Sequence, residues 1–252
     1  MKTMTGKTGC FFIGVFLICC IFTLMTENDY IDREVTYNGL FAASSMDYVL
    51  FTIFQRPFNA IVAPLAVCIM MIVRCHILFS DKIAVRQHSR NEMVTKLLTY
   101  NYMVCFIMII ISVLVILVFN YGRTNDWCNY GDKNSCFYFF TQMVLDESQS
   151  LFLFFKMIVY GYFELLMRVQ IGVVFLIVVK KDWCIFLCTF IATFIMPYRS
   201  FIAVKYGSEY CVDFVYHFYL DDIYFYSLFA LIIVCLLGSL CSRFFMNQRD
   251  FL

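Results

Sequence analysis

Long runs of apolar residues alternate with short polar connections along the whole sequence. A helix that crosses the bilayer core of about 30 Å needs roughly 20 consecutive apolar residues. Runs of about this length predict six transmembrane helices, at residues 8–25, 58–79, 99–120, 151–179, 184–204 and 222–242. No repeat, low-complexity tract or linker rich in proline or glycine interrupts them, so residues 1–252 are predicted to form one all-α membrane domain.

The first apolar run could also be a signal peptide, because Lys2 and Lys7 precede it. No cleavage motif with small residues follows, so we prefer a retained first helix. Gly6-Lys7-Thr8 resembles the end of a phosphate-binding loop, but the earlier glycine and the preceding strand of that motif are missing.

Composition supports a membrane protein. Hydrophobic residues make up 62% of the chain and charged residues 15%, and the mean hydropathy is +0.79, which lies outside the usual range for a soluble domain. A net charge of +1 argues against a nucleic-acid partner, which requires a concentrated basic surface. The longest connection, about 32 residues at 26–57, is too short to fold as a separate catalytic domain. The sequence therefore predicts no catalytic site in this chain.

Charge differs systematically between the connections. Asp and Glu are concentrated at 26–57, 121–150 and 205–221, whereas Lys and Arg dominate the N-terminal residues, the two remaining connections and the C-terminal residues. Lys and Arg remain on the cytoplasmic side of a membrane. The pattern predicts a multi-pass protein of the cell membrane with both termini in the cytoplasm and the acidic connections outside.

Two charged residues lie inside the fourth predicted helix, in "YFELLMR". Glu164 and Arg168 are four residues apart and share one helix face, so they are predicted to form an intramembrane ion pair. The pair could stabilise the helix packing or line a translocation path. The Glu-x-x-x-Arg spacing also resembles part of the motif of membrane-embedded CAAX-type proteases. That interpretation fails because Phe163, and not a second Glu, precedes Glu164, and because the histidines are expected on opposite sides of the membrane, two inside and one outside.

Cysteines and prolines mark three further features. Ten of the 13 cysteines lie in or beside apolar runs and are expected to behave as small hydrophobic residues. Cys128 and Cys136, in an outer connection, could form a disulfide or remain free thiols, and their spacing predicts no metal site. Pro64 and Pro197 could kink the second and fifth helices. The aromatic segment 206–222 is typical of an interfacial belt or of a short helix in the outer leaflet.

The most charged stretch is "DKIAVRQHSRNEMVTK" at residues 81–96, between the second and third predicted helices. Its apolar and charged positions are compatible with a short amphipathic helix at the inner membrane surface. The general bias toward positive charge on the inside explains the sign of the charge. It does not explain the length, because a turn between two helices needs only a few residues.

With this layout the chain resembles the membrane subunits of bacterial type-2 ATP-binding-cassette exporters, in the small form found in peptide or bacteriocin export and immunity. The resemblance rests on the six helices, on "APLAVCIMMIVRC" followed by the basic loop "DKIAVRQHSRNEMVTKLL", and on the apolar outer segment before the sixth helix. It implies that the 81–96 loop docks on a cytoplasmic nucleotide-binding ATPase. The coupling residues implied by position are Arg86, His88, Arg90, Glu92 and Lys96.

The resemblance also implies the partners and the mechanism. ATP and Mg²⁺ would bind to the ATPase subunit and not to this chain, and a second permease copy or a related permease would complete the path through the lipid bilayer. The exported substrate would be a peptide or another amphipathic molecule. A competing interpretation is a membrane immunity or sensor protein that binds a peptide at its outer loops and performs no transport.

Overall fold

The computed structural model describes residues 25, 28–29, 31–36, 40–54, 62–78, 90–120, 122–124, 126–179, 181–194 and 212–248. In these residues the protein is helical, which confirms the all-α prediction. The helices are η1 (Ile31–Val35), α2 (Ser45–Phe54), α3 (Ala63–Leu78), α5 (Arg90–Asn120), α6 (Cys136–Thr141), α7 (Glu147–Val179), α8 (Asp182–Phe194), α10 (Val212–Leu220) and α11 (Ile223–Gln248).

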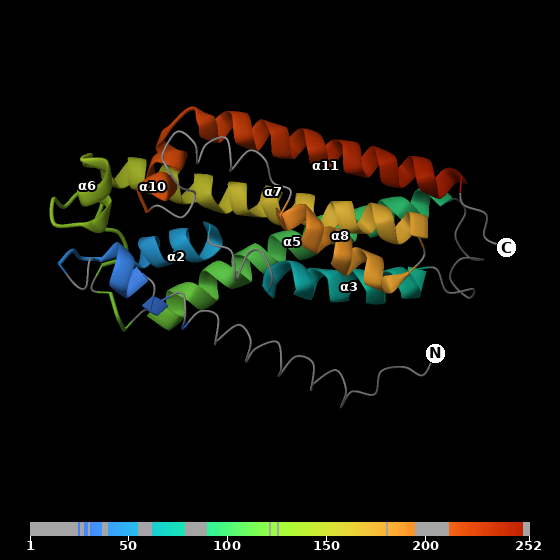
Figure 1. Cartoon of the computed structure of the whole chain (residues 1–252), viewed down its shortest axis with the longest axis horizontal. Helices are drawn as coiled ribbons and strands as arrows, with labels where there is room; N and C mark the ends of the chain where they lie inside the picture. The colour runs from blue at the N-terminus through green and yellow to red at the C-terminus, as the bar shows by residue number, and fades with distance from the viewer. Residues whose placement is uncertain are drawn as a thin grey trace.

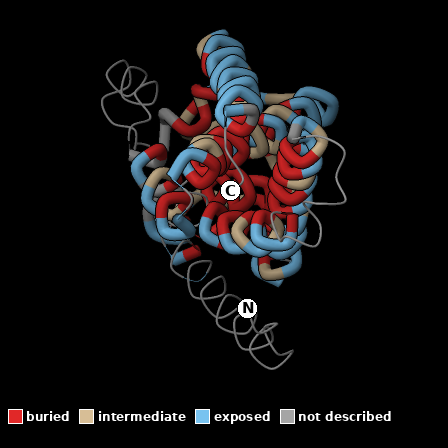
Figure 2. Tube along the Cα trace, turned by 90° about the vertical axis from the view of Figure 1, so that its right-hand side faces the viewer, coloured by how far each residue is buried: buried red, intermediate tan, exposed pale blue. Residues whose placement is uncertain are grey.

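The long helices form an elongated bundle around α7 (Figure 1). Helix α7 packs against α11 and α8 most extensively, and also against α5, α3 and α2. Viewed along the bundle, buried residues face a common centre and exposed residues face outward (Figure 2). Helix α7 is therefore the centre of the core, and its middle residues Glu164 to Gln170 are all buried.

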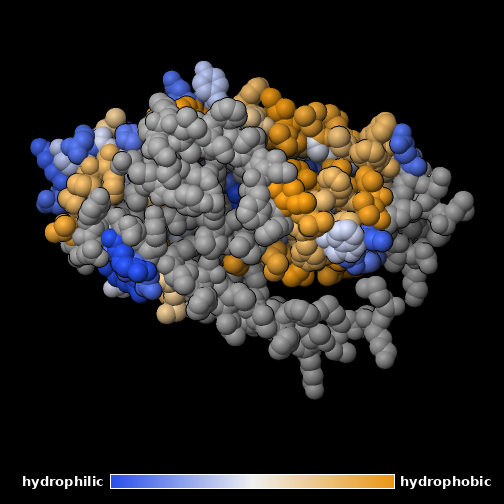
Figure 3. Space-filling model, in the orientation of Figure 1, coloured by the Kyte–Doolittle hydropathy of each residue, from blue (hydrophilic) through white to orange (hydrophobic). Residues whose placement is uncertain are grey.

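Among the residues that the structure describes, three helices are long and apolar enough to cross a membrane: Asn91–Asn120, Glu147–Val179 and Ile223–Met246. Large apolar side chains remain exposed on the outer faces of α5 and α11, among them Phe106, Leu114 and Leu236. On the face that Figure 3 shows, the described residues between the two ends of the bundle are mostly hydrophobic. A surface of this kind requires a lipid environment, so the structure supports a multi-pass membrane protein.

Two of these helices begin earlier than hydropathy predicts. Helix α5 begins at Arg90 instead of residue 99, because Met93, Val94 and Leu97 are buried and continue the apolar face of the helix through a polar sequence. Helix α7 begins at Glu147 instead of residue 151. Hydropathy detects the membrane-crossing part of a helix, whereas buried contacts and caps determine where the helix begins.

The predicted second and fifth helices are only partly described. Helix α3 covers Ala63–Leu78, and Pro64 is its second residue. Residues 55–61 lie outside the described residues, so the kink at Pro64 stays a prediction. Helix α8 covers Asp182–Phe194. Pro197 and the predicted first helix, apart from Met25, lie outside the described residues.

The connections gather at the two ends of the bundle. Helices α2, α6 and α10 lie at one end, and the C-terminal ends of α3, α7 and α11 lie at the other (Figure 1). We call the first of these ends the cap. It consists of the start of α2, helices α6 and α10 and the loops beside them, at residues 40–47, 122–124, 126–146 and 212–222. We call the other end the basic end. There His76 of α3 contacts Asp182 of α8, with 2.8 Å between Nε2 and Oδ2.

Candidate functional site in the cap

The cap is assembled from segments that are far apart in the sequence. The backbone of residues 42–46 is hydrogen-bonded to the 126–136 loop: Ser45 N–H donates to the Asp126 carbonyl and Met46 N–H to the Trp127 carbonyl, both at 3.1 Å. A single parallel bridge pairs Ala42 with Ser135. These bonds hold the first turn of α2 against the loop that precedes α7.

The Asp47 carboxylate lies at the centre of the cap, and its residue is fully buried. One oxygen accepts hydrogen bonds from the Ser44 backbone N–H at 2.7 Å and the Ser44 hydroxyl at 2.8 Å. The other accepts from the hydroxyls of Tyr130 at 2.9 Å and Tyr216 at 2.7 Å. One side chain thus joins α2, the 126–136 loop and α10, which belong to the three acid-rich connections.

The sequence positions this carboxylate through a helix cap. Ser44 precedes α2, and Asp47 is the third residue of the helix, so the Asp47 side chain reaches back to the Ser44 N–H. This is the reciprocal half of a capping box. The backbone of Asp47 in turn donates to the Ser44 carbonyl at 3.0 Å. The contact with Ser44 is an ordinary helix cap. The contacts with Tyr130 and Tyr216 come from other parts of the chain and bury the carboxylate.

The electrostatics of the site are dominated by burial. Loss of solvent raises the pKa of Asp47 above its ordinary value, and the hydrogen bonds from Ser44, Tyr216 and Tyr130 lower it in part. The pKa values of Tyr130 and Tyr216 are raised well above the usual range, first by burial and then by the neighbouring carboxylate. The two hydroxyls therefore stay protonated and act as donors to Asp47.

Aromatic rings enclose the hydrogen-bonded group. Tyr130 stacks on Phe137 with 4.2 Å between ring centroids, and Tyr216 meets the edges of Phe137 and Phe51 at 5.4 Å each. Phe140 stacks on Tyr216, with 5.8 Å between the ring centroids. This packing excludes water from Asp47 and fixes the direction of both hydroxyl groups.

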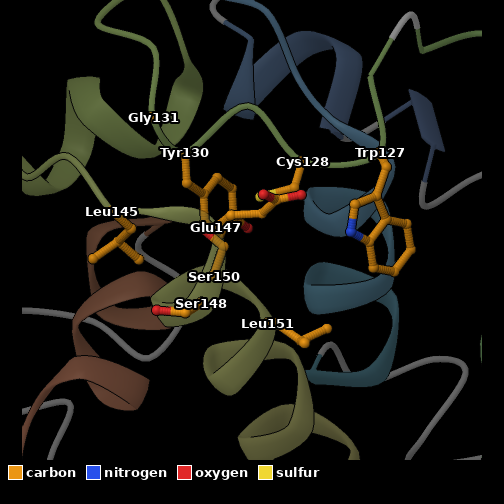
Figure 4. A pocket seen from close by; sticks show the side chains of 9 residues that line it. All are labelled: Trp127, Cys128, Tyr130, Gly131, Leu145, Glu147, Ser148, Ser150 and Leu151. Carbon is orange, nitrogen blue, oxygen red and sulfur yellow. The ribbon is translucent and has the colours of Figure 1, made fainter.

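A pocket of about 660 Å³ opens beside this cluster. It lies between the 127–131 loop and the first turns of α7, and Tyr130 forms part of its wall (Figure 4). Its lining residues are Trp127, Cys128, Tyr130, Gly131, Leu145, Glu147, Ser148, Ser150 and Leu151. Tyr130 therefore contacts both the pocket and the buried carboxylate.

The predicted intramembrane pair is present in the middle of α7. The Nη2 group of Arg168 donates a hydrogen bond to Oε1 of Glu164 at 2.5 Å, and both side chains are buried. A second polar group lies nearby: Asn101 of α5 donates to Gln170 at 2.9 Å, and Gln170 donates to Ser242 of α11 at 3.3 Å. The bundle interior thus contains polar contacts that join α5, α7 and α11.

The predicted coupling residues lie at the basic end, as far as they are described. Arg90 is the first residue of α5, and Lys96 pairs with Glu92 one turn earlier, with 2.6 Å between Nζ and Oε1. Arg86 and His88 lie outside the described residues. Residues 90–96 form the first turns of α5. Residues 81–89 of the stretch that is compatible with a short amphipathic helix lie outside the described residues.

The two outer cysteines are free thiols in the structure. Cys136 is buried and Cys128 is half-buried in the pocket wall. Burial raises the pKa of both thiols, so each is predominantly protonated at neutral pH. The sequence left a disulfide and free thiols open as alternatives, and in the structure both cysteines are free thiols.

Sequence reasoning missed Asp47 and the pocket. Asp47 was counted among the charges of an outer connection, although the pattern Ser44-x-x-Asp47 before an apolar run signals a helix start. A second signal of the same kind precedes α7. There Asp146 accepts from the Gln149 N–H at 2.7 Å, and Gln149 bonds back to the Asp146 N–H at 3.1 Å. No local pattern indicates that Tyr130 and Tyr216 meet.

Comparisons with protein-family models, with curated proteins and with solved structures give no match to this chain.

Proposed function

We propose that this protein is the membrane-spanning permease subunit of an ATP-binding-cassette exporter for a peptide or another amphipathic substrate. In this proposal the chain crosses the membrane six times, with the cap outside and the basic end in the cytoplasm. It catalyses no reaction itself. A separate ATPase subunit binds ATP and Mg²⁺ and docks on residues 81–96, and a second permease copy or a related permease completes the path.

The continuity of α5 is the observation that carries this proposal. The helix runs for 31 residues, which corresponds to about 46 Å, longer than the bilayer core of about 30 Å. Its first turns carry the Glu92–Lys96 pair at the basic end. Its last residue, Asn120, is buried at the other end and accepts a hydrogen bond from Asn28 at 2.9 Å. A displacement at the docking end would thus be transmitted to the cap by a rigid element.

The polar interior supports a transport role. Glu164, Arg168 and Gln170 lie on the central helix, and polar groups inside a membrane are expensive to keep unless they serve packing or a path. Gln170 contacts both α5 and α11, so its hydrogen bonds must change if these helices move relative to α7. ATP binding needs to favour one of two such arrangements by only a few kcal/mol.

Purification of the tagged chain from its native membrane in mild detergent, followed by mass spectrometry, tests the proposal. We expect a nucleotide-binding ATPase to copurify with the wild-type chain. The charge-reversed variant Arg86→Glu, Arg90→Glu should lose the ATPase. The control Arg123→Glu, Lys133→Glu makes the same charge change in the cap and should retain it.

A folded chain that copurifies with no ATPase would contradict the exporter proposal. The second candidate, a membrane immunity or sensor protein, would then be favoured by the ordered cap and its pocket. That candidate predicts that residues 81–89 can be replaced by a neutral linker of equal length without loss of immunity. The exporter predicts that the same replacement abolishes transport.

A further inference from the structure

The cap pocket combines an apolar wall with a carboxylate. Trp127 and Leu151 line it and are 45% and 50% exposed, so a ligand could still bury much of their surface. The Trp127 ring meets the edge of Phe154 with 4.9 Å between centroids, which fixes the orientation of the indole. The volume of about 660 Å³ is within the range of small-ligand sites and could hold a few side chains.

The charge around the pocket is negative. Glu147 lines it, and no salt bridge to Glu147 occurs among the described residues. Residues 126–151 contain four acidic residues and one basic residue, Lys133. The neighbouring Asp146 is ionised, because hydrogen bonds from Gln149 and Ser148 lower its pKa. A cationic group would therefore be attracted to this region and an anionic group repelled.

The start of α7 opposes this attraction, since the N-terminus of a helix carries about half a positive charge. The opposing effect is the smaller one. Asp146 already accepts the Gln149 N–H at 2.7 Å, and Glu147 is the first helical residue, so two carboxylates lie at this terminus. Two negative charges against about half a positive one leave the pocket mouth negative.

From this geometry we infer that the cap pocket binds a lysine or arginine side chain of an amphipathic peptide, together with the apolar residue next to it. Glu147 pairs with the cation, and Trp127 and Leu151 contact the apolar side chain. The inference rests on the proposed function, because it names the class of substrate that this outer face recognises. Tyr130 connects the site to α10 through Asp47, so hydrogen bonds tie the pocket wall to two other segments of the cap.

Binding can be measured on the isolated chain by the fluorescence of Trp127. The chain has two tryptophans, so Trp183→Phe leaves Trp127 as the only reporter. The protein is placed in nanodiscs of zwitterionic lipid and titrated with acetylated, amidated Leu-Lys-Leu, with Leu-Gln-Leu and Leu-Glu-Leu as probes of charge. Empty nanodiscs correct for partition into lipid.

We expect saturable binding of Leu-Lys-Leu and at least twofold weaker binding of the other two peptides. Glu147→Gln should weaken Leu-Lys-Leu binding roughly two- to fivefold, the upper part of the range for one exposed charge pair, and should leave Leu-Gln-Leu unchanged. Asp132→Asn removes one charge from the cap outside the pocket and should have a smaller effect. Equal binding of the three peptides, a signal without saturation, or an unaffected Glu147→Gln variant would overturn the inference.

This titration needs no ATPase, so its outcome is separate from that of the copurification. If the pocket shows no charge selectivity but the chain copurifies with an ATPase, the peptide-binding inference is rejected and the exporter proposal stands. If the pocket is selective but no ATPase copurifies, the binding site stands and the exporter proposal is rejected.

Discussion

At the scale of single residues, Asp47 determines how the cap is held together. Its two oxygens accept four hydrogen bonds, all from protein groups. Solvent water does not reach the carboxylate, because the residue is fully buried. Hydrogen bonds to a charged group are stronger than those between neutral groups. Removing the acceptor would leave several donors unpaired in an apolar surrounding.

Substitution of Asp47 by alanine is therefore expected to destabilise the cap. Each buried donor left unpaired costs about 1–3 kcal/mol, and Tyr130 and Tyr216 both lose their acceptor. Asp47→Asn keeps the size and one acceptor oxygen, so it should cost clearly less. Thermal unfolding of both variants in detergent measures the difference. Equal stabilities of the alanine and asparagine variants would contradict the role of the hydrogen bonds.

The pH dependence of the wild type relative to Asp47→Asn gives an independent test. Burial raises the pKa of Asp47 above its ordinary value of 3.8, so the folded state binds this proton more tightly than the unfolded state. The stability contributed by protonation is complete below 3.8 and is lost as the pH rises through the folded pKa. We expect the wild type to lose stability relative to Asp47→Asn between pH 4 and the folded pKa. A difference in Tm that is constant with pH would reject the assignment.

The Glu164–Arg168 pair could be predicted from sequence, whereas the surroundings of Asp47 could not. The pair follows from a spacing of four residues within one helix, which is local information. The Asp47 site requires Tyr130 and Tyr216, which are 83 and 169 residues away. Only the folded chain determines which of 17 tyrosines meet this carboxylate.

The pair predicts a characteristic pattern of variants. Glu164→Gln leaves a buried guanidinium without its countercharge, which typically costs about 3–5 kcal/mol. Replacement of both residues by leucine and methionine removes both charges and should fold better than the single variant. Yield and melting temperature in detergent measure folding. A double variant less stable than Glu164→Gln would show that each charge stabilises the fold independently of the other.

At the scale of helices, close packing depends on glycines of α7. A Cβ atom added at Gly172 would lie 2.8 Å from the carbonyl oxygen of Ile185 on α8 and would also collide with the Thr189 side chain. A backbone oxygen cannot move without moving the helix, so the contact between α7 and α8 requires glycine at this position. The sequence gives the apolar runs, but not which glycine faces a neighbour.

Gly172→Ala is expected to destabilise the bundle by about 1–3 kcal/mol, the usual cost of overpacking a core. Gly122→Ala is the matched control, because nothing lies within 4 Å of a Cβ atom added there. Size-exclusion profiles and melting temperatures of the two variants provide the measurement. If the Gly172 variant is as stable as the Gly122 variant, α8 is free to move away from α7.

Helix boundaries show what hydropathy can predict. The C-terminal end of α5 at Asn120 and of α7 at Val179 agree with the predicted ends, because each apolar run stops there. The N-terminal ends differ because buried side chains at the start of α5 and a capping box at the start of α7 extend the helices into polar sequence. These interactions depend on single residues and leave the mean hydropathy almost unchanged.

At the scale of the whole molecule, the grouping of the connections predicts the orientation in the membrane. Lys133 is exposed in the cap, and Lys181 is exposed at the opposite end. A short epitope inserted after Lys133 should bind antibody on intact cells, because the positive-inside bias places the cap outside. An epitope after Lys181 should bind only after the membrane is permeabilised. The reverse result would invert the topology and place the pocket in the cytoplasm.

The separation of the three residues in the Asp47 site also affects how the protein is made. Tyr216 follows Asp47 by 169 residues, and a ribosome adds about 5–20 residues each second. For roughly ten to thirty seconds the nascent chain therefore holds an acidic side chain that still lacks its Tyr216 donor. The four hydrogen bonds of Asp47 can be completed only when most of the polypeptide has been translated, so a chain truncated before Tyr216 retains a cap that lacks one of its four donors.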